Sequence, residues 1–233
     1  DLHVRSRRQR QMCIRDSRNT AVLFGDGAGA VVVEESKDSE DGEIFSFVNG
    51  LSSDKLDILE VPNFGSAMDR FKTDEAARVR WTFDGQEIFK GGIRAMAKAS
   101  DEVITKSGLS KADVDILIPH QANLRIVEGL EKMLKLPNAT TIKKVHKYGN
   151  TSAASIPTAL VDALEEGEIK GGEVAVFTAV GAGLSWGACA VRLGKRTTPI
   201  NTSDAKLPDF DGKAVDTIRR AIEYQIPDKL DLI

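Results

Sequence analysis

The chain has 233 residues, of which 41% are hydrophobic, and a formal net charge of −3. This length and composition predict a globular protein of one large or two small domains, and the sequence has neither a signal peptide nor an apolar run long enough for a transmembrane helix. Its only cysteines, Cys13 and Cys189, exclude a disulfide framework and a zinc-type ligand spacing, which favours a cytoplasmic location.

Residues 1–17 differ in character from the rest of the chain. They contain five Arg and almost no apolar periodicity, and the string RQRQMCIRDS resembles a translated sequencing or assembly scar. We therefore interpret residues 1–17 as a non-native arm; a basic arm that binds nucleic acid is the alternative. Residues 1–18 carry six Arg against Asp1 and Asp16, so without their +4 the remainder has a charge of −7. An acidic body argues against a nucleic-acid partner.

Residues 18–36 predict a strand whose middle, GDGAGA, is rich in glycine. Small residues in a strand allow another backbone to approach closely. A phosphate-binding loop is the alternative, but the Lys-Ser/Thr pair of a P-loop is missing and no helical pattern follows the glycines. A second strand is expected over Glu43 to Asn49. Residues 50–82 then show no sustained period, and a loop of that length in a compact domain is usually functional or mobile.

Helical periodicity extends from Asp84 to Ser107, with apolar residues at three- and four-residue steps and Gly108 after the end. A buried strand, Val114 to Ile118, follows and runs into the segment Pro119-His120-Gln121-Ala122-Asn123-Leu124-Arg125. The crevice at the carboxyl ends of strands is where open α/β sheets bind ligands, so His120 is a candidate site residue. A His that caps a helix or satisfies a core polar group is the alternative.

An amphipathic helix is predicted to begin directly after His120 and to end before Pro137. Thr140 to Val145 is β-branched and predicts a short strand. The turn KYGNTSAAS then leads into a helix that extends to about Glu166, and its Ser and Thr residues can cap that helix. Asn150 lies on this turn at the helix entrance, where an Asn also commonly serves the turn with its own side chain.

Two strands, Glu173 to Ala179 and Ser185 to Leu193, are predicted to form a hairpin around Gly181-Ala182-Gly183. The pattern x-Gly-Ala-x-Ala-Val occurs twice, from Asp26 and again from Trp186 within the second of these strands, which indicates duplicated halves. Residues 18–36 would then be the last strand of a missing first half, and residues 43–193 a complete second half. Residues 194–233 form a polar tail with one short helical pattern and no assigned role.

Four motifs in this order, GDGAGA, ILIPHQANLR, KYGNTSAAS and GAGLSWGACAVRL, resemble the second half of a β-ketoacyl-acyl-carrier-protein synthase III. The resemblance covers roughly residues 19–193. It implies an α/β, thiolase-like fold with a mixed sheet, in which this chain is the C-terminal half of a duplicated, five-layered α-β-α-β-α architecture truncated at its N-terminus. It also implies an acyltransferase that starts type II fatty acid synthesis by condensing a short acyl-CoA with malonyl-acyl-carrier protein.

The resemblance implies three catalytic residues: a Cys nucleophile in the first half and a His and an Asn in the second. His120 and Asn150 match that His and Asn, and they would stabilise the enolate formed when malonyl carrier protein loses CO2. The nucleophile has no match, because Cys13 lies in the arm and Cys189 in a strand without a catalytic residue in the family. The chain alone is therefore expected to be inactive.

Further positions are assigned by the same resemblance. The backbone N–H of Ala182 would serve an oxyanion hole for the intermediate at the Cys. Val180 stands where the bacterial enzymes usually have Phe, which puts the surroundings of His120 and the acyl preference in doubt. The other matched positions are Phe89 and Asn123 for substrate binding and Lys90, Arg125 and Lys132 for the carrier protein.

The resemblance implies no cofactor and no metal, with acyl-CoA and malonyl-acyl-carrier protein as substrates. The implied partners are acyl carrier protein, a coenzyme A thioester and a second copy of the complete protein, without nucleic acid or membrane. Two alternatives stay open: a condensing enzyme of other specificity, such as a polyketide or long-chain acyl synthase, and a non-catalytic subunit that binds carrier protein.

Overall fold

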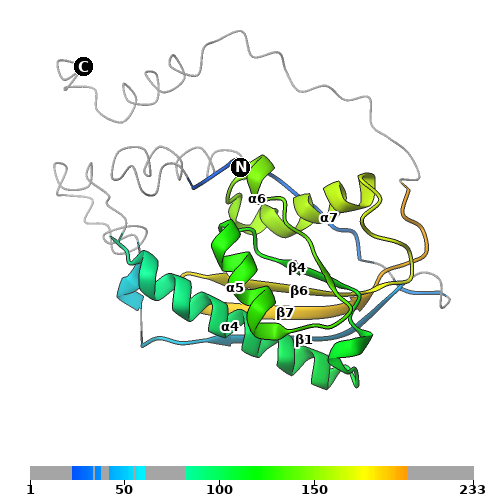
Figure 1. Cartoon of the computed structure of the whole chain (residues 1–233), viewed down its shortest axis with the longest axis horizontal. Coiled ribbons are helices and arrows are strands. Elements are labelled where there is room, and N and C mark those ends of the chain that lie inside the picture. Colours follow the sequence, from blue (N-terminus) through cyan, green and yellow to red (C-terminus); the bar gives the residue numbers. More distant parts are fainter. Residues whose placement is uncertain (1–22, 34, 38–41, 55, 61–81, 199–233) are drawn as a thin grey trace, which may run out of the picture. The chain divides into compact units, whose positions relative to one another are not determined.

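A mixed five-stranded sheet organises the chain in the computed structural model (Figure 1). The strand order is β1-β7-β6-β4-β5, from β1 (Glu43–Leu51) through β7 (Ser185–Arg192), β6 (Val174–Gly181) and β4 (Ile116–Pro119) to β5 (Thr140–Thr141). The first three strands pair antiparallel, whereas β6, β4 and β5 run parallel. This arrangement confirms the predicted mixed α/β sheet and the predicted β6–β7 hairpin.

The structure describes residues 23–33, 35–37, 42–54, 56–60 and 82–198, all of which belong to one compact unit. The arm 1–17, the helical pattern in the tail and most of the excursion 50–82 lie outside the described residues. At the edges of that excursion the structure has a short helix η1 (Leu56–Ile58) and a ribbon of β2 (Leu59–Glu60) and β3 (Thr82–Phe83). No helix in the described ranges is long and apolar enough to cross a bilayer.

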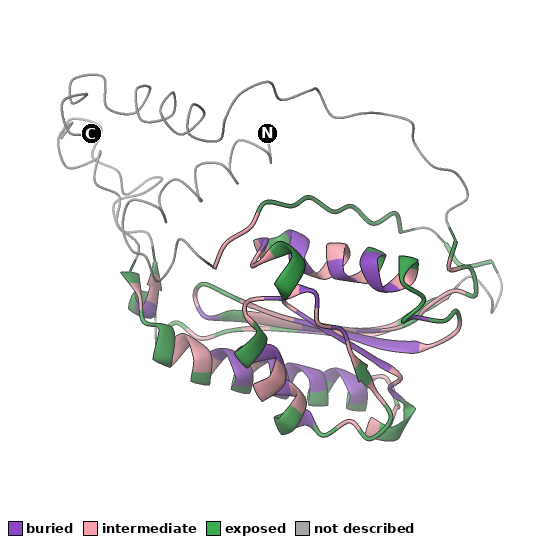
Figure 2. Ribbon diagram, turned by 45° about the horizontal axis from the view of Figure 1, so that its top comes forward, coloured by how far each residue is buried: buried purple, intermediate pink, exposed green. Residues whose placement is uncertain are grey.

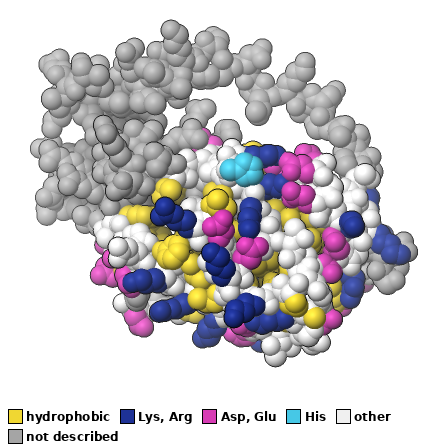
Figure 3. Space-filling model, in the orientation of Figure 1, with side chains coloured by type: hydrophobic (Ala, Val, Ile, Leu, Met, Phe, Trp, Pro, Cys, Tyr) yellow, Lys and Arg dark blue, Asp and Glu magenta, His cyan; other side chains and the backbone are white. Residues whose placement is uncertain are grey.

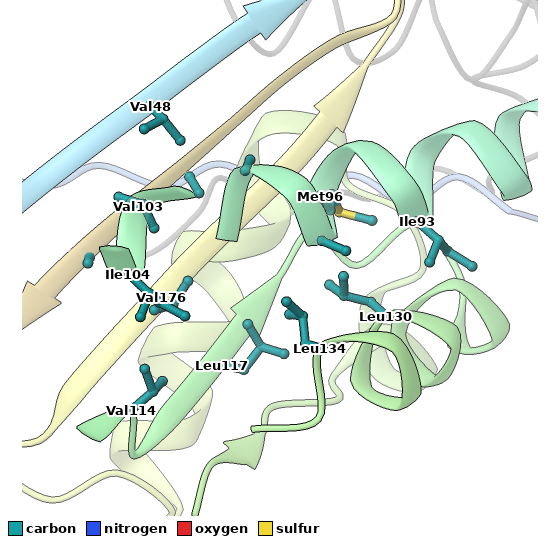
Figure 4. Close-up of a cluster of buried hydrophobic side chains, with 14 of the residues drawn as sticks. Val48, Ile93, Met96, Val103, Ile104, Val114, Leu117, Leu130, Leu134 and Val176 are labelled. Carbon is teal, nitrogen blue, oxygen red and sulfur yellow. The ribbon is translucent and has the colours of Figure 1, made fainter. Parts of the chain in front are cut away.

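Helices α4 (Gly85–Lys106) and α5 (Leu124–Leu134) cover one face of the sheet (Figures 1 and 2). Asp84 begins α4 because its carboxylate accepts from the N–H groups of Gln86 and Glu87 at 3.1 and 3.0 Å. Figure 4 shows the core between the two helices and the sheet, where the largest buried side chains include Met96, Leu117, Leu130, Leu134 and Val176. Burial of such side chains stabilises the fold by about 1.5–3 kcal/mol each.

Helix α7 (Ser155–Glu165) covers the opposite face, preceded by the one-turn helices α6 (Val145–Tyr148) and η4 (Ser152–Ala154) (Figure 1). A second buried cluster joins it to the sheet and contains Ile116, Ile118, Ile142, Ala159, Ala163, Ile169 and Ala175. Successive residues of β4 therefore alternate between the two cores, which explains why the whole strand is apolar. The result is a three-layered α-β-α body.

Two predicted strands differ from the structure. In the described part of residues 19–34 only Phe24 makes a bridge, to Asn150, and Val31, Val32 and Val33 are 70, 90 and 72% exposed. The segment is apolar, as a strand would be. Beyond the bridge of Phe24, however, no strand among the described residues pairs with it to form a ladder. The strand predicted from Thr140 to Val145 ends at Thr141, because Val145 already begins α6. Here the tertiary contacts of Lys144 override the preference of β-branched residues for a strand.

Candidate active site

His120 follows the last residue of β4, at the carboxyl end of the parallel strands. Its backbone N–H donates to the Thr178 carbonyl at 2.8 Å, which continues the β4–β6 pairing by one residue. Its Nδ1 lies 2.6 Å from the hydroxyl oxygen of Ser155, the first residue of α7. Burial lowers the pKa of His120 from 6.5 to about 4, so the imidazole is neutral at pH 7.

Gln121 is buried and holds three elements together at this end of the sheet. Its amide nitrogen donates to the carbonyl groups of Pro119 and Ile142 at 2.7 and 3.2 Å. Its amide oxygen accepts from the N–H groups of Lys144 and Val145 at 2.8 and 3.2 Å. The side chain thus satisfies backbone groups at the end of β4, after β5 and at the start of α6, and it fixes the segment that leads to Asn150.

The turn that carries Asn150 is held by three hydrogen bonds. The side-chain oxygen of Asn150 accepts from the N–H of Ser152 at 2.9 Å, whereas its amide nitrogen has no hydrogen bond to another described residue. The backbone N–H of Asn150 donates to the Leu23 carbonyl at 2.7 Å, and its carbonyl accepts from Gly25 at 2.9 Å. The side chain of Asn150 therefore serves the turn with its oxygen, as the structural alternative proposed, and keeps an amide donor in a fixed orientation.

Glycine is required beside this turn. A Cβ atom on Gly25 would lie 1.7 Å from the Tyr148 carbonyl oxygen, and one on Gly29 would lie 2.4 Å from the ring of Pro157. The Gly-rich segment therefore runs close against α6 and the start of α7, which is the close backbone approach that its composition predicted. Gly149 precedes Asn150 at φ 66°, a left-handed conformation that favours glycine.

A network of charged side chains connects α6 with α7. Lys144 is only 4% exposed and pairs with Glu166 and Glu168 at 2.6 and 2.9 Å. Burial lowers the pKa of Lys144, but the hydrogen bonds that it donates to these carboxylates outweigh burial, and the pKa is raised. The remaining members are Lys147, which pairs with Asp162 and Glu166, and Tyr148, which donates to Asp162. The network holds the two helices that flank the Asn150 turn.

The structure links His120 and Asn150 to the start of the same helix, since Ser155 contacts His120 and begins the helix that follows the Asn150 turn. Ala182 lies in the β6–β7 turn, where its carbonyl accepts from the Ser185 hydroxyl at 3.1 Å. Val180 precedes that turn on β6 and faces Gly92 of α4. Cys189 lies within β7, paired with Phe177, and burial raises the pKa of its thiol, which does not suit a nucleophile.

The other predicted site residues lie on α4 and α5. Asn123 begins α5 by accepting from the Ile126 N–H at 3.0 Å, and Phe89 lies beside the α4–α5 contact at Gly129. Basic side chains with acidic ones among them cover this face in Figure 3. On these two helices the predicted basic residues Lys90, Arg125 and Lys132 are all exposed.

Two residues of the site were missed by the sequence reasoning. Gln121 and Ser155 both lie inside the quoted motifs, and both are polar residues that the structure buries, at 2% exposure each. A polar residue directly after His120 and a Ser within KYGNTSAAS were visible as signals. Ser155 was expected to cap α7, but α7 has no side-chain cap, and the Ser155 hydroxyl contacts His120 and Gln121 instead.

Two family models of known proteins match parts of the chain. Residues 104–193 match the family model "3-Oxoacyl-[acyl-carrier-protein (ACP)] synthase III C terminal", and residues 6–52 match the model of 3-oxoacyl-[acyl-carrier-protein (ACP)] synthase III. The second match begins inside residues 1–17, whose interpretation as a scar stays a prediction. The described residues contain no group of three His, Cys, Asp or Glu side chains that could hold a metal ion.

Individual relatives carry the same name. The β-ketoacyl-[acyl-carrier-protein] synthase III 2 of Vibrio cholerae is 46% identical over 212 residues, which are 89% of this chain and 56% of the relative. The crystal structure of 3-oxoacyl-[acyl-carrier-protein] synthase III from Aquifex aeolicus is 38% identical with a TM-score of 0.63, and the match covers 76% of this chain and 52% of that one.

A further structure, the priming β-ketosynthase of the R1128 polyketide pathway, is 32% identical with a TM-score of 0.69 over 77% of this chain and 52% of that one. The chain thus spans about half the length of the relatives it matches. Both family models and the Vibrio cholerae relative agree with the four sequence motifs. The chain belongs to the 3-oxoacyl-[acyl-carrier-protein] synthase III family.

Proposed function

We propose that this chain is the His- and Asn-bearing half of a condensing enzyme that joins a short acyl-CoA to malonyl-acyl-carrier protein. The single observation that carries the proposal is the pair of oriented donors around one helix start. His120 is neutral and held through Nδ1, and Asn150 is held through its side-chain oxygen. Each residue therefore keeps one N–H donor for a substrate oxygen.

The two donors suit a decarboxylation. When the malonyl thioester loses CO2, the electron pair of the broken C–C bond forms an enolate, and negative charge develops on the thioester oxygen. Donors that are fixed before the reaction stabilise that charge without reorganisation. The enolate carbon then attacks an acyl thioester on the nucleophilic Cys, and the thiolate leaves to give a 3-oxoacyl product.

A second oxyanion would form on the acyl-Cys carbonyl during that attack, and we assign the backbone N–H of Ala182 to it. Support comes from its place in the β6–β7 turn, after the strand that pairs with the His120 backbone. We assign Phe89, Asn123 and Val180 to the substrate channel. Val180 has a smaller side chain than the Phe it replaces, which favours a roomier acyl site.

The nucleophile is assigned to the part of the relatives that this chain does not span. Cys189 is the free thiol among the described residues, and burial raises its pKa. A raised pKa leaves little thiolate at pH 7, and the thiolate is the reactive form. The chain alone is therefore inactive in this proposal, and acylation needs a Cys from the first half.

We extend the proposal to the partners. The exposed basic residues Lys90, Arg125 and Lys132 on α4 and α5 contact the acidic carrier protein. The complete protein works in the cytoplasm as a homodimer, without a cofactor. The absence of a cysteine framework supports the compartment, and the relatives' printed names support the carrier protein.

The test uses a full-length protein, meaning this chain preceded by a complete first half as in the relatives. Incubated with acetyl-CoA and malonyl-acyl-carrier protein, it is expected to release CO2 and form 3-oxobutyryl carrier protein, identified by mass spectrometry. The present chain without that first half is expected to form none. Turnover by the chain alone would contradict the assignment of the nucleophile to the first half. A full-length protein that binds carrier protein without condensation would favour the non-catalytic subunit.

A further inference from the structure

Ser155 uses its hydroxyl in an unusual way for the first residue of a helix. The side chain is 2% exposed, and α7 has no side-chain cap. Its oxygen accepts from the Gln121 N–H at 3.2 Å and lies 2.6 Å from Nδ1 of His120. The hydroxyl therefore connects α7 to two successive residues after β4.

The two contacts limit the groups to which Ser155 can donate its proton. A hydroxyl has one proton to donate, and here a lone pair of its oxygen is occupied by the Gln121 N–H. Among the described residues, Nδ1 of His120 is the only acceptor within hydrogen-bond distance of this hydroxyl. Donation of the Ser155 proton to this acceptor requires Nδ1 to be the unprotonated nitrogen of the neutral ring.

We propose that Ser155 is a positioning residue that holds His120 in the tautomer with its proton on Nε2. Only this tautomer presents an N–H to a substrate oxygen while Nδ1 remains bonded to Ser155. In the other tautomer Nε2 would be an acceptor and would repel a developing oxyanion. The value of the tautomer for catalysis rests on the proposed function, whereas the tautomer itself does not.

Two further observations fit this role. Burial lowers the pKa of His120 to about 4, so a neutral ring with a defined tautomer exists over the whole physiological range. Gln121 positions the hydroxyl from the other side, because its N–H bonds to Ser155 while its side chain is fixed by four backbone groups. The Ser155 oxygen thus has little freedom to rotate its proton elsewhere.

The tautomer can be read directly by nuclear magnetic resonance. The full-length protein is labelled with 15N in its histidine rings, and the His120 signals are assigned by their loss in His120→Asn. At pH 7 we expect Nδ1 to resonate as an unprotonated nitrogen and Nε2 as a protonated one. A protonated Nδ1 in the unmodified protein would overturn the proposal, and this reading needs no mutation and no catalytic activity.

Variants then assign the effect to Ser155. Ser155→Ala is expected to give a mixture of tautomers, while Ser155→Thr keeps the hydroxyl and restores the Nε2–H form. Thr158→Ala is the matched control, because that hydroxyl lies on the same helix and donates to the Ala154 carbonyl at 2.7 Å. An unchanged tautomer in Ser155→Ala would also overturn the proposal.

Measured rates distinguish failure of the positioning role of Ser155 from failure of the proposed function. Decarboxylation of malonyl carrier protein should fall roughly 10- to 100-fold in Ser155→Ala, the range for removing a group that orients a metal-bound His. The KM for malonyl carrier protein should change little, and Ser155→Thr should recover most of the rate. Decarboxylation at the original rate in Ser155→Ala would contradict the positioning role. Absence of condensation in the unmodified protein, with the Nε2–H tautomer present, would instead contradict the proposed function alone.

Discussion

Nδ1 of His120 and the hydroxyl oxygen of Ser155 lie 2.6 Å apart, which ties the end of β4 to the start of α7. The Asn150 turn leads directly into the same helix and is fixed by the Ser152 N–H. The two candidate oxyanion donors therefore share one support, although α5, β5 and α6 separate them in the chain. A change in the position of α7 would move both donors relative to a bound substrate.

Acid should destabilise the chain through His120. Its pKa is about 4 in the folded state against 6.5 unfolded, so the unfolded state binds more protons in the interval between those values. The contribution is complete above pH 6.5 and is lost as the pH falls toward 4. Between pH 7.5 and 5 we expect a loss of about 2 kcal/mol in the free energy of unfolding.

Urea unfolding of the chain and of His120→Gln at both pH values isolates this term, because other groups titrate alike in both proteins. The difference between the two free energies should shrink by about 2 kcal/mol on acidification. A difference that stays constant from pH 7.5 to 5 would show that the folded and unfolded pKa values of His120 are alike.

Gln121→Leu should destabilise the chain strongly. The substitution leaves four backbone groups without their partner, three at the buried residues Pro119, Ile142 and Lys144 and one at the half-buried Val145. Each unpaired group costs about 1–3 kcal/mol, so a total loss of at least about 3 kcal/mol is expected. Gln86→Leu, at an exposed position of α4, is the control and should change stability by less than about 0.5 kcal/mol. Equal midpoints of urea unfolding for the two variants would refute the bridging role.

Two neighbouring lysines should differ in their effect on stability. Lys144 is 4% exposed and bonds two carboxylates, whereas Lys143 is 34% exposed and bonds Glu131 at 2.7 Å. Lys144→Met should lower the free energy of unfolding by about 1–2 kcal/mol, discounted because Glu166 and Glu168 remain 41% exposed. Lys143→Met should lower it by less than about 0.5 kcal/mol. A larger loss in the free energy of unfolding for Lys143→Met than for Lys144→Met would contradict this prediction.

Charge reversal on α4 and α5 should weaken the carrier-protein complex. For Lys90→Glu, Arg125→Glu and Lys132→Glu in the full-length protein we expect a loss of about 1 kcal/mol each, or roughly fivefold in Kd. The KM for acetyl-CoA should stay constant, and the effect should diminish at high salt. Lys106→Glu, an exposed change at the other end of α4, is the control. An equal loss of affinity for carrier protein in all four variants would indicate an effect of net charge and not a docking site.

Much of the fold could be predicted from the sequence because its signals are local. Asp84 and the apolar steps after it fixed α4 to within one residue at each end, and the β6–β7 hairpin followed from two apolar runs around a Gly-rich turn. The segments that failed depend on neighbours. Residues 23–33 form a single bridge, from Phe24 to Asn150, in place of the predicted strand, and α6 begins where Gln121 binds the Lys144 N–H.

The candidate site could be predicted only in part for the same reason. His120 and Asn150 were found because each lies in a motif at the end of an element. Gln121 and Ser155 act between segments that are far apart in the chain, and no pattern of spacing reveals a contact between a helix start and a strand end. Asn150 was weighed between two roles, and the structure shows one of them, since its side-chain oxygen serves the turn.

The central claim is that His120 and Asn150 stabilise the enolate and take no part in forming the acyl-Cys. The full-length His120→Ala and Asn150→Ala proteins test it when CO2 release from malonyl carrier protein and Cys acylation by acetyl-CoA are measured separately. We expect CO2 release to fall roughly 10²- to 10³-fold in each variant, with acylation largely intact. Loss of acylation with unchanged CO2 release would contradict the account.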